Sequence, residues 1–274
     1  MDKMCEELYL KSYQIRKRFL ELFTDLGYGH LTTAFSETEI LISLFYRIMK
    51  FDANSMNTGN SDRLVVSKGH GAGILFPIFE DLEILSREEI KEILRLGGDF
   101  SKIKKMFYPG FEFYGGSLGI GLGMAAGLAL GAKLNREEWL TFCILGDAEC
   151  YEGAIWEAML FAAHNKLNNL IAIVDRNYLG CSDFTENMCE LEPFREKWES
   201  CNWETRVIDG HSHEDILLSM AGVRARQTSK PICVIAKTEK GKGIDYLSNK
   251  PLMHGYMPKG NSVKTAFESL KKFG

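Results

Sequence analysis

Two oxygen-bearing side chains each follow a stretch that is typical of a buried strand. Asp147 comes after the apolar run 140–145, which Gly146 interrupts, and Asn177 follows the apolar run 170–175. The segment between the runs has apolar residues at helical spacing, which predicts a strand–helix–strand unit. Such a unit joins two parallel strands, and both loops then open at the same carboxyl edge of the sheet. We therefore expect Asp147 and Asn177, thirty positions apart in the sequence, to lie side by side.

The oxygens of Asp147 and Asn177 suit a metal ion. A carboxylate, an amide oxygen and free loop carbonyls form an oxygen site for a hard divalent cation, and magnesium with ligands left over for phosphate oxygens fits best. The glycine-bearing loop and the N-terminus of the following helix would also favour an anion. Taken one at a time, Asp147 is better explained by capping a helix, and Asn177 by forming a turn.

Several expected loops carry a histidine beside glycine. His30 follows the end of an expected helix, His70 lies in the sequence Lys-Gly-His-Gly after an expected strand, and His254 precedes a glycine near the end of the chain. Taken alone, His30 is more typical of a solvated loop. His211 and His213 are interpreted as turn and helix-start residues rather than metal ligands.

Two glycine-bearing stretches have different interpretations. The sequence Gly-Gly-Ser-Leu-Gly at 115–119 opens an expected helix over 120–134 that is rich in Gly and Ala. We interpret the small residues 123–131 as part of a tightly packed buried helix. The Lys-Gly-Lys-Gly sequence at 240–243 has no Ser or Thr after its lysines, so it is not a nucleotide P-loop.

The elements that position these loops alternate between apolar strands and amphipathic helices. This alternation predicts an α/β fold that is doubly wound, with a mostly parallel sheet, helices on both faces and a ligand at the carboxyl ends of the strands. We find no repeat or linker and expect a single domain over residues 1–274. Capping boxes are predicted at Ser36-x-x-Glu39 and Ser86-x-x-Glu89. The expected strands are 63–67, 140–145, 170–175, 205–208 and 231–237. The expected helices are 3–26, one that begins at Ser36 and carries residues 40–45, an apolar one over 71–82, and 87–96, 120–134, 153–167, 191–200 and 214–226.

Composition limits the class of protein. The 274 residues are 45% hydrophobic, which is enough for one large core, and the net charge of −4 gives no general attraction to nucleic acid or anionic membranes. Seven cysteines without a C-x-x-C pair indicate reduced thiols, and Cys143 and Cys233 are expected to be buried in strands. The charged N-terminus does not resemble a signal peptide, and no apolar run is long enough to span a membrane. We expect a cytoplasmic protein.

The central motifs resemble a known family. Gly146-Asp147, followed about thirty residues later by Asp175-x-Asn177, resembles the thiamine diphosphate signature. Between them, Glu-Gly at 152–153, Trp-Glu-Ala at 156–158 and Ala-Ala-His at 162–164 resemble transketolases, particularly the amino-terminal halves of split bacterial transketolases. The resemblance covers nearly the whole chain and implies the thiamine diphosphate-binding fold. Ala148 stands where the family usually has Gly, but the metal ligand is retained.

The resemblance implies a thiamine diphosphate cofactor with Mg²⁺ or Ca²⁺. The metal would be held by Asp147, Asn177 and the carbonyl of Leu179. Catalytic roles would fall to His30, His70 and His254, with His30 handling a proton or orienting the substrate. The cofactor-binding residues implied are His70, Gly116, Ser117, Leu118, Gly146, Asp147, Ala148, Glu149, Asn177 and His254.

The implied activity is the transfer of a two-carbon ketol unit from a ketose to an aldehyde, with sugars or sugar phosphates as substrates. Two departures from the family pattern bear on the donor. Thr32 and Thr33 follow His30 in place of Gly-Gly or Gly-Ala, and the loop 97–116 lacks the histidine of the usual Gly-His-Pro motif. Two alternatives stay open: the α subunit of a 2-oxoacid dehydrogenase or acetoin-type enzyme, and a rewired thiamine-dependent carboligase of a biosynthetic pathway.

The resemblance also implies a partner subunit. In the family, the carboxylate that activates the cofactor lies on a pyrimidine-binding domain that follows this one, and the chain stops where that domain would begin. We therefore expect a second polypeptide with the pyrimidine-binding and C-terminal domains, in an α2β2 assembly. The helices over 120–134 and 153–167 are the expected contact faces, because both are more apolar than solvated helices.

Overall fold

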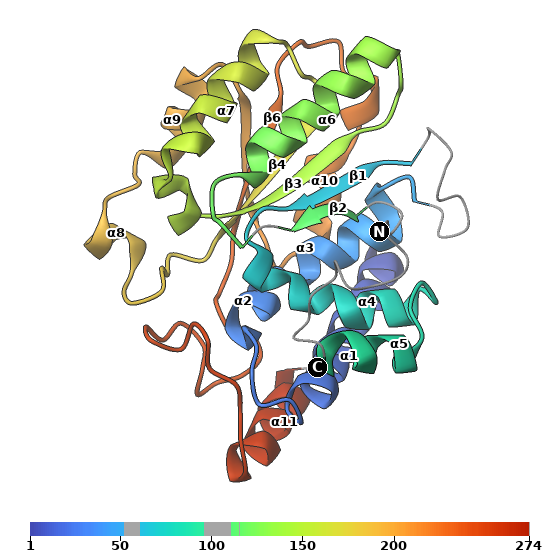
Figure 1. Cartoon of the computed structure of the whole chain (residues 1–274), viewed down its shortest axis with the longest axis vertical. Helices are drawn as coiled ribbons and strands as arrows, with labels where there is room; N and C mark the ends of the chain where they lie inside the picture. Colours follow the sequence, from blue (N-terminus) through green and yellow to red (C-terminus); the bar gives the residue numbers. More distant parts are fainter. Residues whose placement is uncertain (52–60, 96–110, 115, 274) are drawn as a thin grey trace.

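A six-stranded sheet, in which every strand pair is parallel, organises the part of the chain that the computed structural model describes, residues 1–51, 61–95, 111–114 and 116–273 (Figure 1). The strand order is β2-β1-β3-β4-β6-β5. This arrangement confirms the predicted parallel α/β sheet. The strands are β1 (Arg63–Val66), β2 (Phe111–Tyr114), β3 (Thr141–Gly146), β4 (Leu170–Arg176), β5 (Glu204–Asp209) and β6 (Ile232–Lys237).

Alternate residues of the strands pack against helices on opposite faces of the sheet, as expected for strands covered on both sides. Cys143 and Leu145 of β3 belong to one apolar cluster, with residues of α6 (Gly121–Asn135), α7 (Gly153–His164) and α9 (Phe194–Ser200). Phe142 and Ile144 belong to the other cluster, with residues of α1 (Asp2–Phe23), α3 (Thr38–Ser43), α4 (Leu75–Asp81) and α10 (His213–Met220). In Figure 1 the first layer lies above the sheet, and α1, α3 and α4 lie below it.

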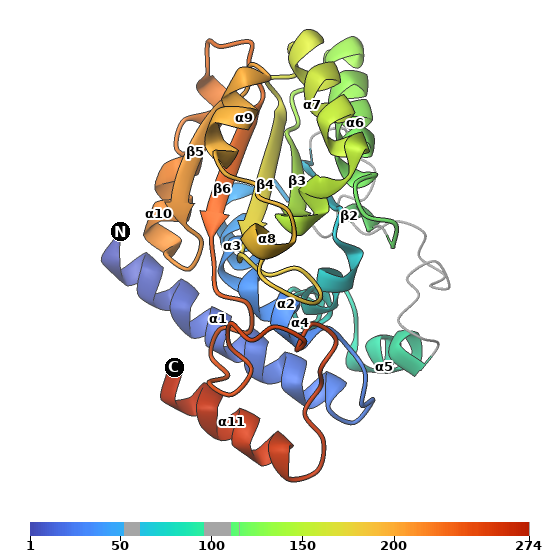
Figure 2. The ribbon, with the colours of Figure 1, turned by 90° about the vertical axis from the view of Figure 1, so that its left-hand side faces the viewer.

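Shorter elements complete the described chain. The C-terminal helix α11 lies alongside α1 (Figure 2). No helix in the described ranges is both long and apolar enough to cross a membrane. The remaining elements are α2 (Leu31–Ser36), η1 (Leu44–Ile48), η2 (Gly69–Ile74), α5 (Arg87–Arg95), η4 (Ala148–Tyr151), α8 (Thr185–Met188), η5 (Val223–Ala225) and α11 (Asn261–Phe273).

One of the two predicted capping boxes is present. At the start of α5, the backbone N–H and hydroxyl of Ser86 donate to Glu89, and the N–H of Glu89 donates back to Ser86 Oγ. The box at Ser36 and Glu39 is wrong. Ser36 is the last residue of α2, and its hydroxyl donates to the carbonyl of Thr33, while Glu39 forms a buried ion pair with Arg16. Glu39 is therefore used to neutralise a buried guanidinium rather than to cap a helix.

The interpretation of the glycines in α6 is also wrong. The alanines of this helix, including Ala125 and Ala129, are fully buried. Gly123 and Gly127 instead face outward, and a Cβ added to either would meet no atom within 4 Å. The small residues therefore split into a buried alanine face and an open glycine face, a distinction that composition alone could not make.

Other element bounds differ modestly from those predicted. The helix expected over 153–167 ends at His164, and the one expected over 214–226 ends at Met220 before a short 3-10 turn. The elements β2, α8 and α11 were not predicted. Cys143 and Cys233 are buried, as expected, and all seven cysteines are free.

Candidate functional site

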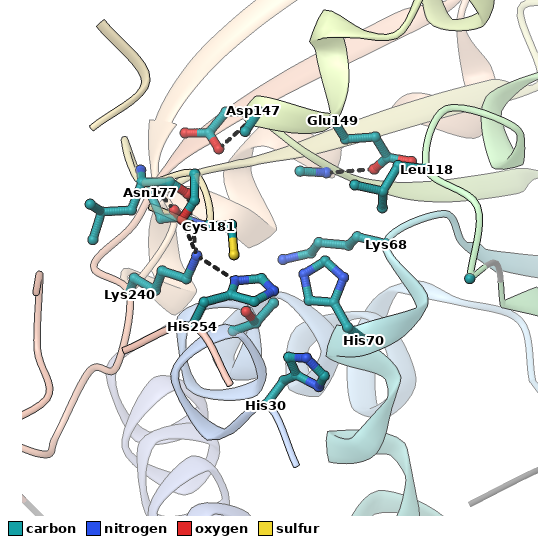
Figure 3. A pocket seen from close by; sticks show the side chains of 16 residues that line it. His30, Lys68, His70, Leu118, Asp147, Glu149, Asn177, Cys181, Lys240 and His254 are labelled. Carbon is teal, nitrogen blue, oxygen red and sulfur yellow. Dashed lines mark hydrogen bonds between the residues drawn. The ribbon is translucent and has the colours of Figure 1, made fainter. Parts of the chain in front are cut away.

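A cavity of about 230 Å³ opens at the carboxyl edge of the sheet, where β1, β3, β4 and β6 end (Figure 3). It gathers eleven of the twelve residues that the sequence assigned to the site. Only Ser117 does not line it, and this residue is exposed. The lining residues are His30, Thr33, Lys68, His70, Gly116, Leu118, Gly146, Asp147, Ala148, Glu149, Asn177, Leu179, Gly180, Cys181, Lys240 and His254.

Asp147 and the loop of Asn177 meet as the strand order requires. Strands β3 and β4 are neighbours, with Gly146 opposite Asp175, so their following loops leave the sheet together. The backbone N–H of Tyr178 donates to Oδ2 of Asp147 over 2.7 Å. Asp147 also caps η4, since its Oδ1 accepts from the N–H of Ala148 over 2.7 Å. Asp147 can therefore cap η4 and also take part in the site, because each carboxylate oxygen can accept more than one hydrogen bond.

The carboxyl group of Asp147 is 1% exposed. Burial and the nearby charge of Asp175 raise its pKa to about 6, although Arg176 and two backbone N–H groups oppose the rise. A positive charge at the site would therefore stabilise the ionised form of Asp147.

One of the oxygens expected to hold a metal, the carbonyl of Leu179, already accepts from a cationic side chain. Nζ of Lys240 donates to the carbonyl of Leu179 over 3.3 Å and to that of Gly180 over 3.1 Å. The amide oxygen of Asn177 accepts one bond, from the N–H of Leu179 over 3.1 Å, and has a second lone pair. The carboxylate, amide and carbonyl oxygens suit a hard cation such as Mg²⁺ or Ca²⁺, so the donor set fits the expected metal.

This donor set contains only one acidic side chain. Within the described ranges, no three His, Cys, Asp or Glu residues converge in a geometry that could hold a metal. A zinc-type site is therefore not found among these residues, whereas a magnesium site completed by phosphate oxygens needs few protein carboxylates.

A buried group of charges forms the floor of the cavity. Nζ of Lys68 pairs with Glu37 over 2.7 Å and with Asp175, and all three side chains are at most 2% exposed. Burial raises the pKa of Glu37 to about 7 despite the charge of Lys68. Burial acts on Asp175 in the same direction, but Lys68, Ser36 and Thr238 outweigh it and hold the pKa of Asp175 below its usual value. Sequence reasoning assigned no role to Glu37 or Lys68, since only the fold brings them together.

Glu149 ties three loops of the site to one another. Its Oε1 accepts from the hydroxyl of Ser67 and from the N–H of Gly119 over 2.8 Å, and its Oε2 accepts from the N–H of Gly146 over 2.9 Å. Burial raises the pKa of Glu149, and these hydrogen bonds oppose the rise. The carboxylate therefore faces the protein's own donors, and its contribution to the cavity is to hold the surrounding loops in place.

Three histidines from separate loops form a cluster opposite the oxygen donors. The ring centroids lie 5.3 Å apart for His30 and His70, 5.1 Å for His30 and His254, and 4.7 Å for His70 and His254. Burial, with the nearby charge of Lys68, lowers the pKa of His70 to about 2. Burial and Lys240 lower the pKa of His254 to about 4 and also lower that of His30. The cluster is therefore uncharged at neutral pH and can both donate and accept hydrogen bonds.

Lys240 is the main cavity residue that sequence reasoning missed. Besides the two carbonyls, its Nζ donates to Nδ1 of His254 over 3.1 Å, so it joins the histidine cluster to the oxygen donors. Burial lowers the pKa of Lys240 to about 8. The Lys-Gly-Lys-Gly sequence at 240–243 was recognised as different from a nucleotide P-loop, but no role in the site was assigned to Lys240. Thr33 also lines the cavity, at the position where Thr32 and Thr33 depart from the family pattern.

His211 and His213 do not line the cavity. His211 contacts Glu39 through Nδ1 over 2.8 Å, and His213 is the first residue of α10, buried between the hydroxyls of Ser12 and Ser43. Their interpretation as turn and helix-start residues is confirmed. The absence of histidine from the loop 97–116 concerns a segment that, except for 111–114 and 116, lies outside the described residues.

Comparison with known proteins agrees with this geometry. The family profile described as "Transketolase, thiamine diphosphate binding domain" matches residues 13–272. Human transketolase is 33% identical over 245 residues, which are 88% of this chain but only 38% of the human protein. The solved structure of transketolase from Campylobacter jejuni superposes with a TM-score of 0.82 and 26% identity, covering 96% of this chain and 42% of that one.

Two bacterial relatives match along almost their entire length. A subunit of the apulose-4-phosphate transketolase from Phocaeicola vulgatus is 32% identical over 267 residues, 97% of this chain and 95% of that protein. A 6-deoxy-6-sulfo-D-fructose transketolase subunit from Clostridium sp. is 33% identical over 275 residues, which cover both chains in full. The chain belongs to the transketolase family and corresponds to its thiamine diphosphate-binding domain.

Proposed function

We propose that this chain is one subunit of a two-chain enzyme, dependent on thiamine diphosphate and a divalent metal, that transfers a two-carbon ketol unit from a ketose to an aldehyde. One observation carries the proposal: a neutral histidine cluster faces a cation-attracting set of oxygens across a single cavity at the carboxyl edge of the sheet. The oxygens suit the metal and diphosphate, and the histidines suit the hydroxyl groups of a sugar.

Each part of the cavity has a proposed role in holding the cofactor. Asp147, Asn177 and the carbonyl of Leu179 would bind Mg²⁺ or Ca²⁺, which requires Lys240 to leave that carbonyl. The diphosphate would lie against Gly146, Ala148, His70 and His254, in loops that Glu149 holds in place. The ring system would lie against Gly116 and Leu118 of the lining, beside the neighbouring Ser117. When bound, thiamine diphosphate supplies a nucleophilic carbon that can add to a carbonyl and store the resulting electron pair.

The histidines would handle the protons and hydroxyl groups of the sugar. His30, His70 and His254 are neutral at pH 7, because burial and the nearby lysines lower their pKa values. A neutral imidazole can accept a proton from a hydroxyl group and return it later, which addition to and release from a carbonyl both require. His30 is the proposed proton-handling or substrate-orienting group.

The partner subunit would cover the outer face of α6 and α7. Ile120 and Met124 of the first helix region and Leu160 and Phe161 of the second are large apolar side chains that are 43–60% exposed. The open glycine face of α6 allows another backbone to approach closely. The relatives named as subunits match this chain end to end, while human transketolase is much longer, which supports a partner subunit. The partner is proposed to carry the pyrimidine-binding and C-terminal domains, in an α2β2 assembly.

The donor is proposed to differ from an ordinary pentulose phosphate. A lost hydrogen bond to a strongly polar group is worth about 1.5–3 kcal/mol, or about one to two powers of ten in rate. The absent histidine in 97–116 therefore predicts weak activity with xylulose-type donors and better activity with another ketol or acyl donor. The relatives named for apulose 4-phosphate and 6-deoxy-6-sulfo-D-fructose indicate that such donor variation occurs among similar chains. The free cysteines support a proposed cytoplasmic location.

Co-expression tests the proposal. The neighbouring gene should encode a chain of about three hundred residues with the remaining transketolase domains, by the usual domain lengths. The two purified together should bind thiamine diphosphate with Mg²⁺ and transfer a ketol unit, whereas the chain alone should show no turnover and bind the cofactor poorly. The donors compared should be pentulose phosphates, non-phosphorylated deoxy sugars and 2-oxoacids.

Three results would contradict the proposal. Full turnover by the chain purified without a partner would refute the half-enzyme assignment. Release of carbon dioxide from 2-oxoacids would favour the 2-oxoacid dehydrogenase or acetoin-type alternative. Ordinary turnover with a pentulose phosphate would refute the altered donor.

A further inference from the structure

Arg176, the last residue of β4, places a guanidinium group directly behind Asp147. The side chain is 1% exposed, and its Cζ lies 4.2 Å from the centroid of the Tyr178 ring. Its Nη1 donates to Oδ2 of Asp147 over 3.2 Å, the same oxygen that accepts from the N–H of Tyr178. Arg176 and Tyr178, neither of which lines the cavity, therefore fix the orientation of this carboxylate together.

The other contacts of the same guanidinium reach a separate segment. Nη1 also donates to Oγ1 of Thr185 over 2.8 Å, and Nη2 donates to Glu186 over 2.7 Å and to Glu192 over 3.0 Å. Thr185 and Glu186 open α8, which forms part of the excursion between β4 and β5 (Figure 1). A single buried side chain thus joins the carboxylate behind the cavity to the segment 185–192.

Only an arginine side chain can make this set of contacts from an enclosed position. The two glutamate side chains are partly exposed, at 34% and 53%, whereas the guanidinium and Asp147 are almost fully enclosed. The planar fork of arginine can serve Asp147 with one nitrogen and both glutamates with the other, which the single ammonium of lysine cannot reproduce.

We propose that Arg176 is a positioning residue that couples Asp147 to the segment 185–192, so that binding of a divalent cation and ordering of this segment stabilise each other. The proposal rests on the proposed metal role of Asp147. Without the guanidinium, Asp147 keeps only its backbone donors, and the two glutamates lose their shared partner. Removal of a residue that orients a metal ligand typically lowers metal affinity about 10–100-fold.

A purely electrostatic role for Arg176 predicts the opposite sign. A cation beside a metal ligand repels the metal, so its removal should tighten metal binding. Three carboxylates nevertheless surround the guanidinium, so the cluster of four side chains has a net negative charge. The positional effect should therefore outweigh the repulsion, and the direction of the change in metal affinity separates the two explanations.

The experiment uses the chain assembled with its proposed partner subunit, with Mn²⁺ as a spectroscopic probe in the presence of thiamine diphosphate. Loss of the paramagnetic resonance of free Mn²⁺ gives the dissociation constant, and hydrogen exchange reports on the segment 185–192. Arg176→Gln should weaken Mn²⁺ binding about 10–100-fold and abolish the protection of this segment by Mn²⁺. Arg176→Lys should fall between wild type and Arg176→Gln, and Arg195→Gln, an exposed arginine paired with Glu199, is the matched control.

A double variant covers the case in which the arginine variants do not fold. Glu186→Gln with Glu192→Gln keeps the Arg176–Asp147 contact, yet coupling predicts weaker Mn²⁺ binding and faster exchange in 185–192. Unchanged or tighter binding in Arg176→Gln, or in the double variant when the former does not fold, overturns the inference. Asp147→Asn distinguishes this failure from a failure of the metal site, because wild-type Mn²⁺ affinity in that variant would refute the proposed function itself.

Discussion

The side-chain amide of Asn177 donates a hydrogen bond to Oδ2 of Asp175 over 3.0 Å. Asp175 is itself paired with Lys68 in the buried floor of the cavity. The donating nitrogen of the amide is thereby held toward the floor, which leaves its oxygen as the group available to a metal. The ion cluster beneath the cavity and the oxygen donors above it are therefore parts of one arrangement.

Replacement of Asp147 should have the largest effect on the cofactor. It provides the only carboxylate among the proposed metal ligands, so Asp147→Ala removes the charged ligand that would hold the cation. Without the cation, the negative charge of the diphosphate is uncompensated. We predict loss of divalent-dependent thiamine diphosphate binding with the fold retained, measured by calorimetry on the assembled enzyme and by circular dichroism. Asn177→Ala should weaken binding by less, because water can replace a neutral ligand. Wild-type affinity in Asp147→Ala would refute the metal assignment.

Removal of Asp175 should destabilise the protein as well as the site. Asp175→Leu leaves the buried ammonium of Lys68 with Glu37 as its main partner, and breaking a buried ion pair typically costs about 3–5 kcal/mol. The free energy of unfolding, from chemical denaturation, should fall by that order. The double variant Lys68→Met/Asp175→Leu should recover part of the loss, since no buried charge remains once Glu37, whose pKa burial raises to about 7, takes up a proton. Strictly additive losses would show that the pair is not coupled.

Glu149 should be important for stability although it performs no chemistry. A glutamine amide offers one acceptor where the carboxylate has two, so Glu149→Gln sets its NH₂ group against the donors on Ser67, Gly119 or Gly146. We expect a loss of about 1–3 kcal/mol in unfolding free energy and weaker cofactor binding. The exposed neighbour Glu152 supplies the matched control, Glu152→Gln. Equal melting temperatures for the two variants would contradict the loop-tying role.

The pH dependence of stability should include a contribution from His213. Burial lowers its pKa to about 4, although the charge of Glu39 opposes this, whereas an unfolded histidine has a pKa of about 6.5. Between these values the unfolded chain binds more protons, so the unfolding free energy falls as the pH drops from about 6.5 to 4. One such group contributes a slope of at most about 1.4 kcal/mol per pH unit.

The measurement compares denaturation curves across this pH range. His213→Asn should flatten the decline relative to wild type, and the exposed His164→Asn is the control. An unchanged slope in His213→Asn would show that this histidine does not titrate differently in the two states. Three half-buried histidines of the cavity also have lowered pKa values, so the variant should reduce the slope and not remove it.

The sequence predicted the parts of the site that depend on chain topology. Asp147 and Asn177 could be paired because strand–helix–strand units are parallel and because their motif is distinctive. The three-histidine cluster was found by resemblance, since no spacing in the sequence links His30 to His254. The residues expected at the cavity were therefore largely correct.

The contacts that could not be predicted from the sequence are those between segments far apart in the chain. The ion group of Lys68, Glu37 and Asp175 forms only when three separate elements meet, and none of these residues lies near another in sequence. The same limit explains the wrong capping box at Ser36: a capping pattern is local, but Glu39 is neutralised by Arg16 from another helix. The ammonium group that donates to the carbonyl of Leu179 comes from Lys240, about sixty positions away in the sequence.

The strand order has a consequence for synthesis of the protein. Strand β4 is buried along its whole length between β3 and β6, but β6 begins only at Ile232, about 55 residues after β4 ends. At a translation rate of about 5–20 residues per second, one edge of β4 waits roughly 3–11 s for its second neighbour. During that interval its free N–H and C=O groups and apolar side chains can pair with another chain. Aggregation during production should therefore depend on translation and chaperone supply, even for variants whose folded state is fully stable.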